Sequence, residues 1–118
     1  MQINYCSIQP NCSFKWEQFG FLKPKLCKIF FRIVELCSEK NIEVIITSGY
    51  RKKTNDSGIH ELCRAIDFIL SDNSDNVVDW LLSEINDTYV YDFRRPNIQT
   101  LIWHKVKESN WHFHLQIL

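Results

Sequence analysis

Hydrophobic residues recur at helical spacing in two stretches of the chain. The longer pattern begins at Pro24, and its apolar side chains recur every three or four residues up to Asn41. The second begins after Ser74, a candidate N-cap, and ends at Asn86-Asp87. Both stretches are therefore predicted to form amphipathic helices with one face on a core.

Four other stretches are typical of β-strands, at 43–47, 64–70, 101–106 and 111–117. The first has three consecutive apolar residues, as expected for a strand covered on both faces. The first two dozen residues show no clear period, so we expect an irregular segment packed by its aromatic side chains. This order of elements predicts an α+β fold, with a small antiparallel sheet and helices packed on one side.

Composition points to one globular domain over residues 1–118, because 45% of the residues are hydrophobic and 14% are aromatic. Fourteen basic and fourteen acidic residues cancel, which argues against nucleic acid or an anionic membrane as the partner. No opening segment resembles a signal peptide, and no run reaches the roughly 18 apolar residues of a membrane span. We therefore expect a monomeric, cytoplasmic product. Five cysteines without paired spacing predict reduced thiols.

The C-terminal strand is predicted to present two imidazoles on one face. Side chains two residues apart share a face of a strand, so His112, His114 and Gln116 point one way and the apolar residues between them point the other. Asp67 lies among apolar residues of the 64–70 stretch, where an unpaired carboxylate is costly to bury. We therefore expect a positively charged partner beside Asp67.

A metal ion is the partner that this pattern favours. His60 and Asp67 are too far apart for one helical face, but a turn followed by a strand can bring both to one cation. Two histidines, a carboxylate and an open position commonly hold catalytic zinc. The alternative is a salt bridge from Asp67 to Arg51 or Arg64. Cys63 is a further candidate ligand, for a structural zinc site.

The order of these residues resembles the LAS group of zinc metallopeptidases, and more narrowly its D-alanyl-D-alanine carboxypeptidase branch. That branch has Ser-Gly-Tyr-Arg at a strand end, then His-x-x-Gly-x-Ala-x-Asp, then a late His-x-His. The corresponding residues here are Ser48 to Arg51, His60 to Asp67, and His112 to His114, so the match covers roughly residues 44–118. The resemblance implies the hedgehog/DD-peptidase fold, which small phage-encoded peptidoglycan peptidases share.

The resemblance also implies a function, the hydrolysis of amide bonds in the peptide stem of bacterial peptidoglycan. In this assignment His60, Asp67 and His114 bind Zn²⁺, and His112 orients the zinc-bound water or stabilises the oxyanion. Arg51 holds the substrate carboxylate in a bidentate pair, which suits a planar guanidinium. Zinc lowers the pKa of its water to about 7 and polarises the scissile carbonyl.

The general base is where the chain departs from the branch. Many members place Asp or Glu three residues before the last zinc ligand, and this chain has Trp111 there. Glu108 is one substitute, if the turn before the last strand folds back. His104 is the other, if its strand pairs so that it lies opposite His112 or His114.

Two further differences leave the activity open. The Ser often found two residues before the first ligand is replaced by Gly58, which leaves neighbouring Ser57 as a candidate substrate contact, and Cys63 stands where the branch has Gly. The missing acid favours a noncatalytic zinc-binding domain that binds a peptide or protein partner. The retained Arg51 and the two-histidine face favour the peptidase. Without a signal peptide, a wall enzyme needs another route, such as lysis by a phage that encodes it.

Overall fold

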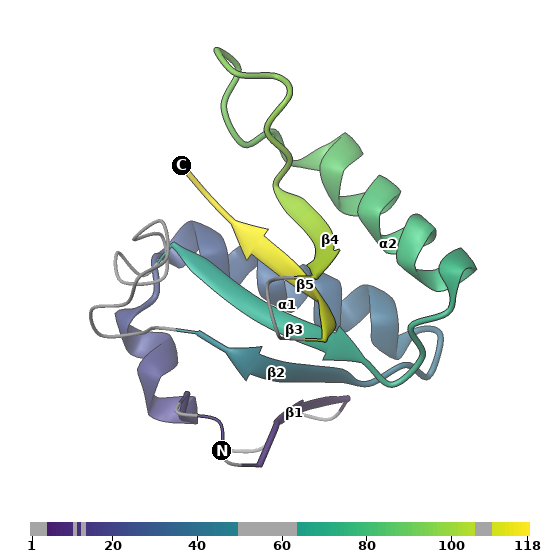
Figure 1. Ribbon diagram of the computed structural model, residues 1–118. Coiled ribbons are helices and arrows are strands. Elements are labelled where there is room, and N and C mark those ends of the chain that lie inside the picture. Colours follow the sequence, from purple (N-terminus) through teal and green to yellow (C-terminus); the bar gives the residue numbers. More distant parts are fainter. Residues whose placement is uncertain (1–4, 11, 13, 50–63, 106–109) are drawn as a thin grey trace.

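One five-stranded sheet organises the chain, which is described by a computed structural model over residues 5–10, 12, 14–49, 64–105 and 110–118 (Figure 1). The helices and the sheet together confirm the predicted α+β class. In chain order the elements are β1 (Cys6–Ile8), a 3₁₀ helix η1 (Trp16–Phe21), α1 (Pro24–Ser38), β2 (Val44–Ser48), β3 (Ala65–Leu70), α2 (Asp75–Thr88), β4 (Leu101–Lys105) and β5 (Trp111–Gln116).

The sheet is mixed, so the expectation of a purely antiparallel sheet is wrong at one edge. Its strand order is β1-β2-β3-β5-β4, and every neighbouring pair is antiparallel except β1 and β2. The backbone N–H of Val44 donates to Tyr5 and that of Gln9 to Ile46, which ties β1 to β2. A parallel pair needs a long crossover, and η1 and α1 supply it here.

The first predicted helix is confirmed as α1, which begins at Pro24 as expected. Proline suits this position because its fixed φ is already helical and its missing N–H would have no partner in the helix. The helix ends at Ser38, three residues before the predicted end. Asn41 then adopts a left-handed conformation with φ of 58°, and the N–H of Ile42 donates to the carbonyl of Cys37 at 2.9 Å. This closes the end of the helix in the manner of a C-terminal cap.

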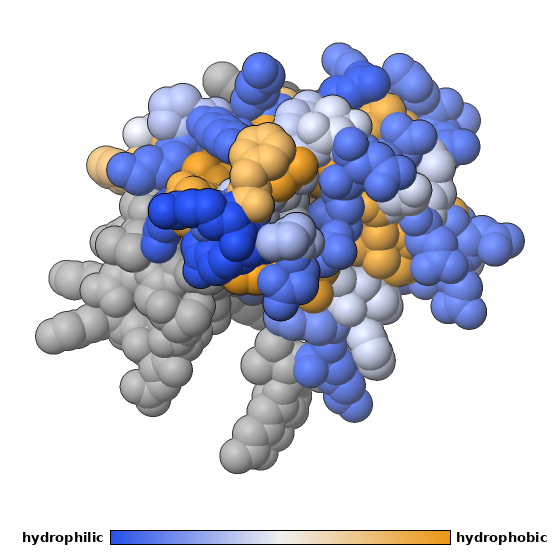
Figure 2. Space-filling model, turned by 90° about the horizontal axis from the view of Figure 1, so that it is seen from above, coloured by the Kyte–Doolittle hydropathy of each residue, from blue (hydrophilic) through white to orange (hydrophobic). Residues whose placement is uncertain are grey.

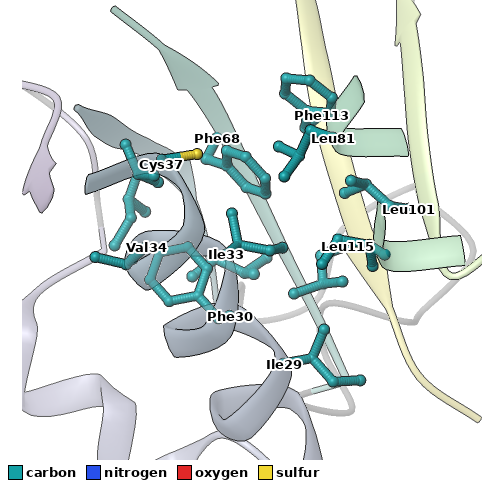
Figure 3. Packing of buried hydrophobic residues seen from close by; sticks show 14 of the residues in the cluster. Ile29, Phe30, Ile33, Val34, Cys37, Phe68, Leu81, Leu101, Phe113 and Leu115 are labelled. Atoms are coloured by element: carbon teal, nitrogen blue, oxygen red, sulfur yellow. The ribbon is translucent and has the colours of Figure 1, made fainter. Parts of the chain in front are cut away.

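The helices cover one face of the sheet and leave the candidate site on the other. Figure 3 shows Phe30 and Ile33 of α1 pointing toward Phe68 of β3, while Leu81 of α2 lies beside Phe113 of β5. The rings of Phe68 and Phe113 stack with their centroids 5.0 Å apart. Because strand side chains alternate, this apolar packing turns the intervening residues of β3, β4 and β5 to the opposite face.

The predicted core cysteines pack as hydrophobic residues. Cys37 is fully buried within the cluster and Cys27 packs against it. Burial raises the pKa of the Cys37 thiol to about 12, so it stays protonated and inert at neutral pH. The described cysteines Cys6, Cys12, Cys27 and Cys37 are all free thiols, as predicted. No helix in the described part of the chain is long and apolar enough to cross a membrane.

The buried carboxylate of Asp92 accepts hydrogen bonds within the connector between α2 and β4. Asp92 is 5% exposed and accepts hydrogen bonds from the guanidinium groups of Arg94 and Arg95. These bonds, chiefly those from Arg94, lower the pKa of Asp92 to about 2.

The same turn exposes an aromatic side chain, since Phe93 is 87% exposed. Figure 2 views the end of the molecule from which this connector projects in Figure 1, and shows hydrophobic side chains set among strongly hydrophilic ones.

A β-bulge in β2 shapes the edge of the candidate site. Ile46 pairs with Phe68, but Ser48 pairs with Asp67, so Thr47 is an extra residue on β2. The bulge brings the first residue of the Ser-Gly-Tyr-Arg motif next to the buried carboxylate. Ser48 and Asp67, which belong to separate parts of the sequence motif, thus lie opposite each other in the sheet.

Gly49 follows the bulge and allows the close approach of an aromatic ring. A Cβ on Gly49 would lie only 2.2 Å from Cδ1 of Phe14. The Phe14 side chain is fully buried and packs edge-on against Phe19, with ring centroids 5.1 Å apart. The ring is therefore held from several sides, and only glycine fits opposite it.

We expect Gly49→Ala to lower the free energy of unfolding by about 1 to 3 kcal/mol, because its methyl group would displace the Phe14 ring or the bulge. Urea denaturation monitored by circular dichroism measures the change. Gly20→Ala is the matched control, since a Cβ there meets no atom within 4 Å, and it should stay within about 0.5 kcal/mol of the native chain. Equal stability of the two variants would contradict the packing of Phe14 on Gly49.

Candidate functional site

A buried carboxylate and an imidazole form the centre of the candidate site. Asp67 of β3 lies directly opposite His114 of β5 in the antiparallel pairing. Oδ1 of Asp67 is 2.8 Å from Nδ1 of His114, and the two side chains are only 10% and 12% exposed. A carboxylate at this depth needs a hydrogen-bonded or charged partner. The predicted meeting of Asp67 and the C-terminal histidine face is therefore found in the structure.

His112 lies on the same face of β5, as the alternation of the strand predicts. Its Nδ1 is 3.0 Å from the backbone carbonyl of Asn110. A carbonyl can only accept, so Nδ1 carries a proton in this bond, and whenever the ring is neutral Nε2 holds the lone pair. Nε2 points toward Asp67 and lies 3.8 Å from Oδ2, beyond direct hydrogen-bond reach.

His104 also faces the site. The sequence left open whether its strand pairs so that His104 lies opposite His112 or His114, and the structure shows that it does. It pairs opposite His112 in the β4–β5 ladder. Its ring packs edge-on against His112, with centroids 4.8 Å apart, and lies 5.6 Å from the ring of His114. Three imidazoles from two strands therefore share one face of the sheet with Asp67.

Burial and its neighbours keep His104 neutral. Desolvation lowers the pKa of His104, and the nearby His112 and His114 lower it further, while Asp67 acts in the opposite direction. The buried Nε2 of His104 has no hydrogen-bond partner among the described residues. A neutral imidazole whose Nε2 has no partner in the described part of the chain thus lies next to the Asp67–His114 pair.

Gln116 completes this face of the sheet, and its role was not recognised from the sequence. Its Oε1 lies 3.2 Å from Nε2 of His114, and its Nε2 donates to the carbonyl of Gln99 at 2.9 Å. Gln116 is only 6% exposed. The available signal was its position two residues after His114, on the same face of the strand.

Other predicted site residues lie outside the part of the chain that the structure describes. They are the proposed ligand His60, the catalytic candidate Glu108, the substrate contacts Arg51 and Ser57, and Cys63. The salt-bridge alternative for Asp67 named Arg51 and Arg64. Nε of Arg64 is buried and finds no hydrogen-bond partner among the described residues, whereas both histidines of β5 lie near Asp67.

The donor atoms of Asp67 and His114 suit zinc, which binds carboxylate oxygen and imidazole nitrogen. Two tetrahedral ligands about 2.0 to 2.1 Å from zinc lie about 3.3 Å apart. The observed 2.8 Å is instead the length of a charge-assisted hydrogen bond. A shared proton therefore lies between the atoms in this arrangement, and a small opening of the pair is needed to admit a metal.

A catalytic zinc ion usually has three protein ligands. Among the described residues, no group of three or more His, Cys, Asp or Glu side chains is arranged to hold a metal ion.

No protein-family model matches the chain, and searches of the curated proteins and of the solved structures find no match. The resemblance to the LAS group rests on the motif residues of the sequence alone.

Replacing His104 tests whether this face is built for stability. We expect the free energy of unfolding of His104→Phe to equal that of the native chain or to exceed it by up to about 1 kcal/mol, because the change removes a buried nitrogen that has no hydrogen-bond partner among the described residues. His112→Phe is the matched comparison, and it should cost about 1 kcal/mol through loss of the bond to Asn110. Urea denaturation of the metal-free protein measures both. A larger loss for His104→Phe than for His112→Phe would contradict this description of the site.

Proposed function

We propose that this protein is a zinc-dependent peptidase that hydrolyses amide bonds in the peptide stem of bacterial peptidoglycan. The reaction is that of a D-alanyl-D-alanine carboxypeptidase or an endolysin-type endopeptidase on a hedgehog/DD-peptidase-like domain. The observation that carries the proposal is the buried Asp67–His114 pair, which shares one sheet face with His104 and His112. The motif resemblance supports the choice of substrate.

Asp67 and His114 hold the metal in this proposal, together with His60 from outside the described residues. His114 is preferred of the two histidines on β5 because the resemblance makes the second His of His-x-His the ligand, and it is the one that contacts Asp67 directly. Zinc, when bound, supplies a Lewis acid for the scissile carbonyl and an acidified water. The other residues of the site handle protons and the substrate.

In this proposal the two remaining imidazoles transfer protons. Nε2 of His112 faces Asp67 because Nδ1 is held by Asn110. It can accept a proton as water oxygen bonds to the carbonyl carbon, and deliver it to the leaving nitrogen as the C–N bond breaks. His104 is a second neutral base within ring contact of His112. Glu108 is the carboxylate alternative and lies outside the described residues.

The substrate contacts are assigned from the motif. Arg51 binds the substrate carboxylate, and Ser57 lies beside it in the same segment of the sequence. The bulge in β2 supports this assignment, since it brings Ser48 opposite Asp67 and so starts the Ser-Gly-Tyr-Arg motif at the site. A wall substrate also fits the proposed route of release, by lysis of a cell infected by an encoding phage.

A noncatalytic zinc-binding domain is the second candidate. It is favoured by one observation, that Asp67 is the sole carboxylate on the site face of the described strands β3, β4 and β5. If Asp67 binds the metal, no other described acid is available as the general base. Such a domain would use the same face to bind a peptide or protein.

Turnover of a defined stem peptide tests the peptidase. We expect the native protein to shorten a synthetic pentapeptide ending in D-alanyl-D-alanine, or to release stem fragments from purified peptidoglycan, as measured by mass spectrometry. Chelation should stop the reaction and added Zn²⁺ should restore it. His112→Phe should lower kcat by about 10²- to 10⁴-fold, because a proton-transfer group is lost.

The control distinguishes a metal ligand from any buried carboxylate. Asp67→Asn should abolish both zinc binding and turnover, whereas Asp92→Asn, at an equally buried position in the connector, should keep both. Zinc binding without turnover of either substrate would reject the peptidase in favour of the binding domain. Absence of bound zinc in the native protein would reject both candidates.

A further inference from the structure

Gln116 makes side-chain contacts with two separate segments. Its Oε1 lies 3.2 Å from Nε2 of His114 on its own strand, and its Nε2 lies 2.9 Å from the backbone oxygen of Gln99, just before β4. The side chain is buried and on the same face as Asp67. Both polar ends of this buried side chain therefore have a hydrogen-bond partner.

The direction of each bond follows from the chemistry of the partners. The carbonyl of Gln99 can only accept, so the NH₂ group of Gln116 must face it. The carbonyl oxygen of Gln116 then faces His114, and Nε2 of His114 must be the donor. The bond to Gln99 thus fixes which hydrogen-bonding atom Gln116 presents to the imidazole, and with it the proton on Nε2.

The backbone oxygen that fixes Gln116 is itself held in place. The N–H of Gln116 donates to the carbonyl of Thr100 at 2.9 Å, and the Thr100 hydroxyl donates to the carbonyl of Tyr89 at 2.7 Å. The side chain of Asn86 on α2 both accepts from and donates to the backbone of Leu101, at 2.9 Å each. Helix α2 and the start of β4 therefore position Gln99 relative to Gln116.

We propose that Gln116 is a positioning residue for the metal ligand His114, and that it keeps the proton on Nε2 so that Nδ1 is the nitrogen presented to the metal beside Asp67. This inference rests on the proposed zinc function and goes beyond it. The structure presents Nδ1 of His114 to Asp67 and Nε2 to Gln116. Ligating histidines generally donate their second N–H to a fixed acceptor, which sets the tautomer and the ring orientation.

The two bonds of Gln116 can be separated by substitution. Gln116→Met is close in length and removes both. Gln116→Glu loses the donor to Gln99 but keeps an oxygen that accepts from His114. Both variants lack the bond to Gln99, and only Gln116→Glu can still accept from His114. The difference in zinc affinity between the two variants therefore measures the bond to the imidazole.

Competition with a chelating dye measures the zinc dissociation constant of the native chain and of both variants. We expect Gln116→Met to weaken zinc binding by about 10- to 100-fold, the usual cost of removing such a partner. Gln116→Glu should recover most of this loss. Thermal unfolding of the metal-free proteins shows whether each variant is folded before its zinc binding is compared.

Nitrogen-15 NMR supplies a readout that is independent of activity. In the metal-free native chain, Nε2 of His114 should carry a proton, and in metal-free Gln116→Met it should lose that proton, because Asp67 still holds a proton at Nδ1. An unprotonated Nε2 in the native protein, or zinc binding by folded Gln116→Met equal to native, would overturn the inference and leave the proposed function standing. No zinc binding by the native chain would instead reject the proposed function, while the metal-free spectrum would still show whether Gln116 keeps the proton on Nε2.

Discussion

Burial of the Asp67 carboxylate within the sheet is the constraint on which the rest of the site depends. Moving a charge from water into a protein interior costs several kcal/mol unless partners compensate it. Asp67 meets this demand through His114 at 2.8 Å, with His112 close by. Such a pair contributes little net stability compared with apolar residues of the same size. An arrangement of this kind is better explained by function than by folding.

The apolar face of the sheet determines the polar face. Phe68 pairs with Phe113 across β3 and β5, and their stacked rings lie under the helices. Their neighbours Asp67 and His114 are then necessarily opposite each other on the other face, because strand side chains alternate. A slip of one residue would bury an imidazole and expose a phenyl ring. The hydrophobic core thus fixes the register, and the register assembles the site.

Much of this arrangement followed from the sequence, because strong periodicity marks the helices and alternation marks β5. The strand at Cys6–Ile8 was missed, since three residues carry no readable period and its pairing with β2 depends on a long crossover. The facing of His104 depends on register, which only the pairing of β4 with β5 decides. The role of Gln116 depends on Gln99, whose carbonyl is placed by a connector without periodic pattern.

Crystals of the protein grown with Zn²⁺ test the proposal that Asp67 and His114 share a zinc ion. Diffraction data on both sides of the zinc absorption edge locate the metal without reference to activity. We expect one anomalous peak about 2.0 to 2.2 Å from Nδ1 of His114 and from a carboxylate oxygen of Asp67. An anomalous peak elsewhere, or a retained 2.8 Å hydrogen bond between these residues with no zinc beside them, would contradict it.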